Sequence, residues 1–328
     1  MNSSTLQPTE SAKGVVLAID LGGTHLRAAL VDNAGRIRKQ IKRETPKSDS
    51  PACVVNAILE TERELRLADE RLVAASVMVP ATVDKANDIV VQAPNLPCLD
   101  NFDLKRALEE KFGWPVVLEN DANAAAVGEM WLGAARGFRN VICVTLGTGV
   151  GGGVILDGKL WRGSDGSAGE IGHAPVDPFS GLHCKCGNEG CLEMFASATA
   201  IVRMANEGLP QFPQSILNGR DMTAQKVYEA GLEGDELALS VFEHVGKYLG
   251  VALTTLINVL NPEIIVIGGG VANGWSLFEK PMREQVAARA FKAQRGKVKI
   301  VPAECGDNAG LLGAAKLAFD SEETRAKR

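Results

Sequence analysis

The chain has 328 residues, of which 45% are hydrophobic and 23% are charged, a composition typical of a soluble globular protein with one large or two ordinary domains. Its formal net charge of −5 leaves no basic excess for binding nucleic acid. Residues 1–13 are polar and lack the apolar segment of a signal peptide, and the longest apolar run, 248–260, is too short to span a bilayer. We therefore expect a cytoplasmic protein that contacts neither nucleic acid nor a membrane.

The first predicted unit is a strand, a glycine turn and a second strand. The apolar run 15–19 leads into Asp20-Leu-Gly-Gly-Thr24, and 25–31 continues as a strand. Backbone N–H groups at Gly22 and Gly23 can approach a phosphate group closely, because no Cβ atom intervenes. Taken alone, the segment also fits an ordinary hairpin turn.

The next segment places a carboxylate at a strand-to-helix junction. Its patterns predict helices at 54–67 and 102–112, a strand at 72–79 and a rigid loop at 93–97. A short strand, 116–118, is followed by Glu119-Asn-Asp121 and an alanine-rich helix, 122–131. Asp121 therefore lies where a helix begins, a position at which aspartate is also common as an N-cap.

A second strand–glycine turn–strand unit follows. The strand 141–146 leads into the glycine-rich run 147–153, a strand at 154–156 and the hairpin turn Asp157-Gly158. Two such units predict a duplicated architecture in which each lobe offers one phosphate loop. A dinucleotide site is disfavoured because no helix follows the glycines. A P-loop is rejected because Leu160 stands where a magnesium-binding Ser or Thr is required.

The remaining elements are mostly helical. The sequence predicts helices at 192–205, 223–230, 235–260 and 308–319. It also predicts strands at 264–267 and 298–301 and a Pro/Gly loop at 208–220. Gly246 and Gly250 lie one turn apart in the long helix and indicate close packing against another backbone.

Three cysteines form a compact cluster in Cys184-Lys-Cys186-Gly-Asn-Glu-Gly-Cys191. One further ligand would complete a tetrahedral zinc site, and the candidates are His173 and His183. We favour His173, because His183 is adjacent to a cysteine ligand and would need awkward geometry. Four protein ligands would make the zinc structural rather than catalytic. The alternative is a disulfide with one free thiol, and the other four cysteines are expected in the core.

Two glutamates and a histidine gather around this cluster. Glu170 precedes His173 by three residues, and Glu193 follows the last cysteine by two. Carboxylates and an imidazole suit the adjacent hydroxyl groups of a sugar, although glutamates are also common as plain surface residues. The pattern thus favours a sugar site beside a metal.

Phosphoryl transfer would make use of the two glycine turns. A γ-phosphate needs N–H donors and Mg²⁺, and one carboxylate must accept the proton of the attacking hydroxyl group. Asp121, at a strand end with Asn120 beside it, fits the role of that base. Asp20 can help to hold Mg²⁺ through water.

Seven motifs occur in an order that is typical of one family. They are Asp20-Leu-Gly-Gly-Thr24, Ala93-Pro-Asn-Leu-Pro97, Glu119-Asn-Asp-Ala-Asn-Ala-Ala-Ala126, the glycines of 147–153, Glu170-Ile-Gly-His173, Cys184-x-Cys186-Gly-x-x-Gly-Cys191-x-Glu193 and Asn308-Ala-Gly-Leu-Leu-Gly-Ala314. Over nearly its whole length the chain resembles the ROK family of sugar kinases and repressors. The cysteine motif together with Glu-Ile-Gly-His is highly specific.

This resemblance implies an α/β protein with the actin-like ATPase fold, two ribonuclease-H-like lobes with a central cleft. The small lobe is expected at 14–121, completed by the C-terminal helix 308–320, and the large lobe with the zinc knuckle at 122–307. The resemblance further implies an ATP-dependent hexose kinase of the glucokinase type. Such an enzyme uses ATP and Mg²⁺, acts usually on the C6 hydroxyl group, carries a structural Zn²⁺ ion and forms a homodimer.

Residue roles follow from matching the motifs one by one. Asp121 matches the general base. The sugar-binding positions are Asn95, Asn120, Asp121, Glu170, His173 and Glu193. The nucleotide-binding positions are Asp20, Gly22, Gly23, Thr24, Arg27, Gly147, Thr148, Gly149 and Gly269. The zinc ligands are His173, Cys184, Cys186 and Cys191.

Three departures from the family pattern bear on the sugar site. Ala81 stands where the family usually has glycine, in a loop that borders the sugar, so its methyl group is expected to bear on specificity. His25 stands where Asn or Lys is common. The segment from His173 to Cys184 is one residue longer than usual, which keeps His183 open as a ligand.

Other functions are weighed against the glucokinase reading. The motifs do not separate glucose from fructose, mannose or an N-acetylhexosamine. A sugar-responsive repressor is disfavoured, because only residues 1–14 precede the first predicted strand and they show no helix-turn-helix pattern. A non-catalytic sugar sensor is disfavoured by the intact Asp121 and by both phosphate turns.

Overall fold

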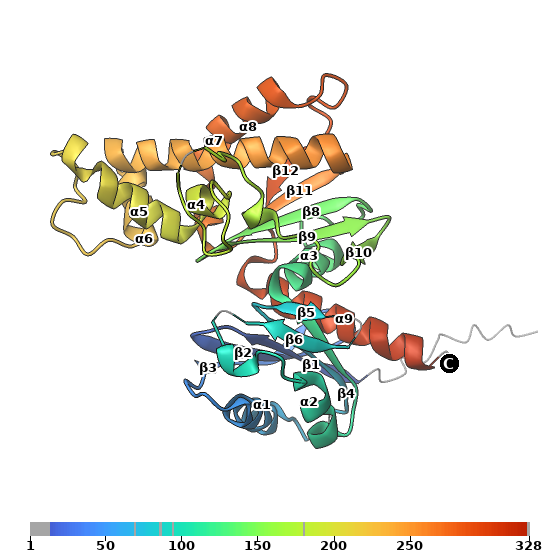
Figure 1. Ribbon diagram of the computed structural model, residues 1–328. Helices are drawn as coiled ribbons and strands as arrows, with labels where there is room; N and C mark the ends of the chain where they lie inside the picture. Colours follow the sequence, from blue (N-terminus) through green and yellow to red (C-terminus); the bar gives the residue numbers. More distant parts are fainter. Residues whose placement is uncertain (1–13, 69, 85–86, 94, 180, 327–328) are drawn as a thin grey trace, which may run out of the picture.

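The computed structural model describes residues 14–326 except 69, 85–86, 94 and 180. Figure 1 shows two lobes, one above the other, with a helix pair between them. Residues 1–13, where a DNA-binding segment was not expected, lie outside the described residues. Among the described helices, none combines the length and the apolar character needed to cross a membrane.

The small lobe is built on a five-stranded sheet of order β3-β2-β1-β4-β7. Its strands are β1 (Val15–Leu21), β2 (His25–Val31), β3 (Ile37–Glu44), β4 (Leu72–Val79) and β7 (Val116–Asn120). β1 pairs antiparallel with β2 and parallel with β4. The apolar strands β1 and β4 are central, whereas β3, with charges at alternate positions, forms an edge and exposes every second residue.

Helices cover both faces of this sheet. They are α1 (Pro51–Leu65), α2 (Leu104–Phe112) and α9 (Ala309–Ala326), and a hairpin of β5 (Thr82–Asp84) and β6 (Ile89–Gln92) with a short 3₁₀ turn, η1 (Pro97–Leu99), lies beside them. Leu17 and Ile19 of β1 pack on the side of α1 and α2, while Val16 and Ala18 pack against α9. The alternation follows from the two-residue period of a strand.

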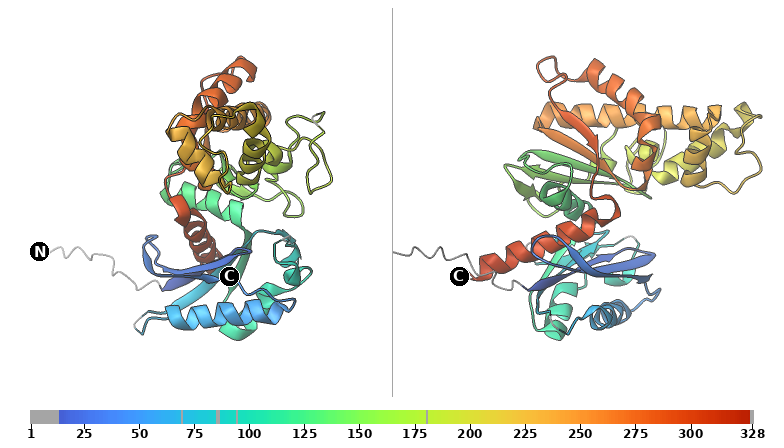
Figure 2. Two further views of the ribbon diagram at one scale, coloured as in Figure 1. Left: turned by 90° about the vertical axis from the view of Figure 1, so that its left-hand side faces the viewer. Right: turned by 180° about the vertical axis from the view of Figure 1, so that it is seen from behind.

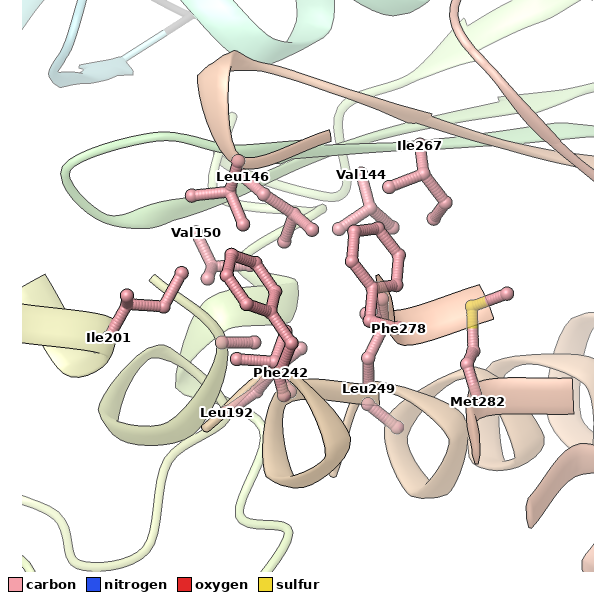
Figure 3. Packing of buried hydrophobic residues seen from close by; sticks show 14 of the residues in the cluster. Val144, Leu146, Val150, Leu192, Ile201, Phe242, Leu249, Ile267, Phe278 and Met282 are labelled. Atoms are coloured by element: carbon pink, nitrogen blue, oxygen red, sulfur yellow. The ribbon is translucent and has the colours of Figure 1, made fainter. Parts of the chain in front are cut away.

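The large lobe repeats the same plan with the sheet order β10-β9-β8-β11-β12. Its strands are β8 (Val141–Leu146), β9 (Val150–Leu156), β10 (Lys159–Trp161), β11 (Ile264–Gly268) and β12 (Lys299–Pro302). Its helices are α3 (Asp121–Leu132), α4 (Glu193–Ala196), α5 (Ala198–Gly208), α6 (Ala224–Leu232), α7 (Glu236–Leu260) and α8 (Trp275–Arg289), with 3₁₀ turns η2 (Ile171–His173), η3 (Leu209–Gln211), η4 (Gly270–Gly274) and η5 (Gly306–Asn308). In Figure 3, Phe242 of α7 lies beneath Leu146 and Phe278 of α8 lies beneath Val144 of β8, in the main hydrophobic core.

The duplicated sheet order confirms the predicted fold class, the actin-like ATPase fold with ribonuclease-H-like lobes. In each lobe three antiparallel strands are followed by two parallel ones. Helices α3 and α9 cross between the sheets (Figures 1 and 2). A Cβ atom on Gly313 would lie 1.7 Å from the carbonyl oxygen of Ala124, so only glycine permits this close crossing.

We propose the lobe boundaries expected from the sequence, 14–121 with the C-terminal helix for the small lobe and 122–307 for the large lobe. The packing of α9 on β1 and β4 and the packing of α3 on β8 and β9 support this division. The C-terminal helix is longer than expected, because it continues to Ala326.

Some predicted elements were wrong in detail. The helix expected at 192–205 is two helices, because Ser197 adopts an extended conformation and caps α5 through the N–H group of Ala200. The glycine-rich loop expected at 147–153 ends at Gly149, and Gly151, Gly152 and Gly153 lie inside β9. Helix α8 was not foreseen; it contains Pro281, a residue that usually argues against a helix interior.

Candidate active site

Asp121 is the first residue of α3, directly after β7. The cap of this helix is Asn120, whose Oδ1 atom accepts the N–H groups of Ala122, at 2.9 Å, and Asn123, at 3.2 Å. The N-cap role that was the alternative for Asp121 is therefore filled by Asn120. The Asp121 carboxylate accepts the backbone N–H group of Ala122 at 2.8 Å, and the residue is exposed to solvent.

The environment of Asp121 makes it a stronger base than an ordinary aspartate. Although its carboxylate reaches solvent, protein surrounds it closely enough that loss of hydration is the largest cause of a pKa raised to about 6. The carboxylates of Asp20 and Glu170 act in the same direction, Asp20 more strongly. Asp20 belongs to the small lobe and Glu170 to the large one, so charges from both lobes act on Asp121.

The first glycine turn joins β1 and β2. It is closed by the N–H group of Gly22, which donates to the carbonyl of His25 at 2.9 Å, and it is held from outside by the hydroxyl of Thr45, which donates to the carbonyl of Gly22 at 2.6 Å. Thr24 is exposed at the tip. A Cβ atom on Gly23 would lie 2.7 Å from the Cβ of Asn95. The structure thus brings the first predicted phosphate turn against a predicted sugar residue.

Asp20 and Arg27 face each other across β1 and β2 and form an ion pair, with Nε of Arg27 2.8 Å from Oδ2 of Asp20. Nη1 of Arg27 donates to the carbonyl of Asp307, just before α9, at 3.0 Å. Asp20, the predicted Mg²⁺ residue, and Arg27, a predicted nucleotide residue, are therefore ion-pair partners. The hydrogen bonds among the described residues leave Oδ1 of Asp20 unused.

The second glycine turn, 147–149, joins β8 and β9 in the same way. The N–H group of Gly147 donates to the carbonyl of Gly149 at 2.9 Å, and the hydroxyl of Thr199 donates to the carbonyl of Thr148 at 2.8 Å. Gly269 has a φ of +83° and lies against Leu146, the last residue of β8. The predicted nucleotide residues of the large lobe thus gather at one end of its sheet.

The three predicted sugar residues of the large lobe lie around the cysteine cluster. Nε2 of His173 is 3.9 Å from Oε2 of Glu170, while its Nδ1 atom points toward Cys184. Glu193, at the start of α4, accepts the N–H group of Val150 at 2.9 Å. His173 therefore presents one ring nitrogen to the cysteines and the other toward the candidate sugar site.

The predicted zinc ligands come together and His183 does not join them. The ligand atoms of His173, Cys184, Cys186 and Cys191 all lie within 4.8 Å of one another. The side chain of His183 is 78% exposed, and its Nδ1 atom pairs with Glu189 at 3.2 Å. The longer segment before Cys184 does not bring His183 to the cluster.

Two features of the site were not foreseen from the sequence. Cβ atoms on Gly151 and Gly153 would lie 2.8 and 2.6 Å from the methyl groups of Ala122 and Ala126, so the glycines let the start of α3 approach β9. Ala81 belongs to the hydrophobic cluster of the small lobe, and its carbonyl accepts from Nδ2 of Asn120 at 3.4 Å. A run of glycines inside a strand was the available signal for the first feature.

A model of the ROK family matches residues 16–321. The chain belongs to the ROK family. A glucokinase of Halalkalibacterium halodurans is 37% identical over 321 residues, which cover 95% of this chain and 97% of that enzyme. Among solved structures, a ROK glucokinase from Streptomyces griseus in complex with glucose and AMPPNP is 35% identical, covers 94% of this chain and 100% of that one, and superposes with a TM-score of 0.82.

The ROK relatives also include repressors. The xylose repressor of Bacillus subtilis is 30% identical over 311 residues, which cover 94% of this chain and 77% of the repressor. Membership of the family alone therefore does not separate kinases from regulators.

Proposed function

We propose that this protein is a glucokinase-type hexose kinase that transfers the γ-phosphoryl group of ATP to the C6 hydroxyl group of glucose. The state of Asp121 carries the proposal: its neighbour Asn120 caps the helix, and its pKa is raised to about 6 by loss of hydration and by the charges of Asp20 and Glu170. A base with this pKa is ionised at neutral pH and can still accept a proton from a hydroxyl group. The similarity to glucokinases supports the choice of reaction.

The proposed reaction uses the residues in three groups. Asp121 accepts the proton as the sugar oxygen attacks the γ-phosphorus. The turns 22–24 and 147–149, with Gly269, hold the nucleotide through backbone N–H groups. The residues that orient the hexose are Asn95, Asn120, Glu170, His173 and Glu193. The amide of Asn120 keeps one N–H for the sugar, since Oδ1 caps α3 and the other N–H faces Ala81.

The donors near the phosphate turns suit a hydrated Mg²⁺ ion. Asp20 offers Oδ1, while Arg27 neutralises Oδ2. Magnesium keeps several waters and needs one or two carboxylates besides the phosphates. When bound, it would neutralise the charge that develops on the phosphate oxygens.

The cysteine cluster suits a structural Zn²⁺ ion. With zinc–sulfur and zinc–nitrogen distances of about 2.3 and 2.0–2.1 Å, a tetrahedral site has edges of roughly 3.8 Å between sulfurs and 3.6 Å between sulfur and nitrogen. The Sγ atoms of Cys186 and Cys191 are 3.7 Å apart, and Nδ1 of His173 is 3.6 Å from Sγ of Cys184. The four ligands would fix the orientation of His173 and leave no position for a catalytic water.

The remaining expectations stay proposals of the same kind. A cytoplasmic location suits seven cysteines that form no disulfide among the described residues. The family resemblance favours a homodimer. The charge and the apolar runs of the sequence favour a protein that contacts neither nucleic acid nor a membrane. Fructose, mannose and an N-acetylhexosamine are the alternative substrates, and a sugar-responsive regulator is the alternative class.

The test is a panel of hexoses in an assay coupled to ADP release, with zinc measured in the same sample. We expect the highest kcat/KM with glucose and about one zinc ion per chain. A chain that binds glucose but releases no ADP with any hexose would support the regulator instead.

A further inference from the structure

A partly buried ion pair joins the two lobes beside the candidate active site. Nε of Arg162 is 2.7 Å from Oε2 of Glu119. Glu119 is the next-to-last residue of β7 in the small-lobe sheet, and Arg162 directly follows β10 in the large-lobe sheet. The side chain of Glu119 is 2% exposed, whereas that of Arg162 is 32% exposed.

On the small-lobe side, Glu119 is tied to the start of α3. Its Oε1 atom accepts the backbone N–H group of Asn120 at 3.1 Å and Nδ2 of Asn123 at 3.2 Å. Asn120 is the cap of α3 and Asp121 is its first residue. A shift of the Glu119 carboxylate is therefore passed directly to the backbone that carries Asp121.

On the large-lobe side, Arg162 lies at the base of the loop 162–168, which leads to Glu170. The carbonyl of Arg162 accepts the N–H group of Ala168 at 3.1 Å, which closes the loop 162–168. The next residue, Gly169, has a φ of +94° and would place a Cβ atom 2.6 Å from the carbonyl oxygen of Gly152 in β9. The loop is thus fixed at both ends before Glu170 begins the turn to His173.

We propose that the Arg162–Glu119 pair is a positioning device: it holds the strand end that carries Asp121 against the loop that carries Glu170, and so sets the rate of phosphoryl transfer. The proposal rests on the proposed role of Asp121. A buried ion pair contributes little net stability compared with neutral side chains of similar size, so geometry is the better account of its presence. A displacement of about 1 Å at a reacting group can lower a rate roughly a hundredfold.

The same geometry predicts which constants respond. The hydrogen bonds that shape the turns 22–24 and 147–149 involve other residues, among them Thr45 and Thr199. ATP binding is therefore expected to be independent of the pair. Turnover is expected to depend on the pair. Glu119 accepts the backbone N–H group of Asn120, the neighbour of Asp121, and the carbonyl of Arg162 closes the loop that leads to Glu170.

The experiment compares Arg162→Met with the double variant Glu119→Gln/Arg162→Met. The single change takes the Arg162 cation away from the buried Glu119 carboxylate and is expected to lower both melting temperature and kcat. The double change also removes the charge of Glu119, so the melting temperature is expected to return to within about 3 °C of the wild type, while kcat stays roughly tenfold or more below it. KM for ATP is expected to remain within about twofold.

The control is Arg106→Met, which breaks an ion pair whose two side chains are 76% and 62% exposed. It should change neither kcat nor stability. The proposal is overturned if the double variant turns over within about twofold of the wild type, or if KM for ATP rises while kcat is unchanged. A wild-type chain that phosphorylates no hexose would instead refute the kinase assignment, and this inference with it.

Discussion

Glu193 accepts the backbone N–H group of Val150, with 2.9 Å between N and Oε2. A Cβ atom on the preceding Gly149 would lie 2.3 Å from the same oxygen. Glu193, which is proposed to bind sugar and lies two positions after Cys191 of the cysteine cluster, thus also fixes the end of the second glycine turn. The candidate sugar site and the candidate nucleotide site therefore share a side chain.

The first prediction concerns this shared side chain. Glu193→Ala removes both the proposed sugar contact and the bond to Val150, so KM should rise for glucose and for ATP, each by roughly tenfold or more, as expected for hydrogen bonds to a charged group. Steady-state kinetics with each substrate varied in turn measures the effect. Glu189→Ala is the matched control, because Glu189 lies in the same knuckle and pairs with the exposed His183. An effect on glucose alone would show that the bond to the turn is dispensable.

The second prediction concerns stability and pH. The pKa of Asp121 is raised from 3.8 to about 6 in the folded chain, so ionised Asp121 disfavours the folded state as the pH rises through this range. Asp121→Asn should therefore melt at a higher temperature than the wild type above pH 6, by about 1–3 °C given the solvent access of the group. The difference should vanish below about pH 4, where both forms are neutral. Melting temperatures of both proteins, measured between pH 4 and neutral pH, test this prediction. A variant that is less stable than the wild type at neutral pH would contradict it, because the folded protein would then stabilise the ionised carboxylate.

The third prediction concerns the metal. Cys191→Ser should bring the zinc content of the purified chain close to zero, lower the melting temperature by about 5 °C or more, and raise KM for glucose by loosening His173. His183→Ala should retain the metal, because His183 lies outside the cluster. Metal analysis and calorimetry on the two variants provide the check. Full zinc retention by the cysteine variant would contradict the assignment of ligands.

Much of the fold and part of the site could be predicted from local signals. Asp235 caps α7 through the N–H group of Ala238, and Asn261 ends that helix with a φ of +46°, as the residue types indicate. Contacts between distant segments could not be predicted in this way. The Arg162–Glu119 pair joins residues 43 positions apart, and the approach of α3 to Gly153 depends on how two elements pack.

The fourth prediction tests the expectation for Ala81. The family resemblance implied that glycine is usual at this position and that the methyl group of Ala81 bears on sugar specificity. In the structure Ala81 is buried in the hydrophobic cluster of the small lobe. Ala81→Gly should therefore lower the free energy of unfolding by about 1–2 kcal/mol, through the lost methyl group and the added backbone freedom. The ranking of glucose, mannose and fructose should stay unchanged in the hexose panel; a reordered panel would return Ala81 to the sugar site.

The most direct test of the account is the turnover of Asp121→Asn with glucose and ATP, measured beside its affinity for glucose. The substitution keeps the size of the side chain, and Asn120 keeps the cap of α3. If Asp121 is the general base, kcat should fall by roughly 10²–10⁴-fold while the glucose dissociation constant stays within about threefold of the wild type. A variant that binds glucose and ATP normally and retains full turnover would contradict the account.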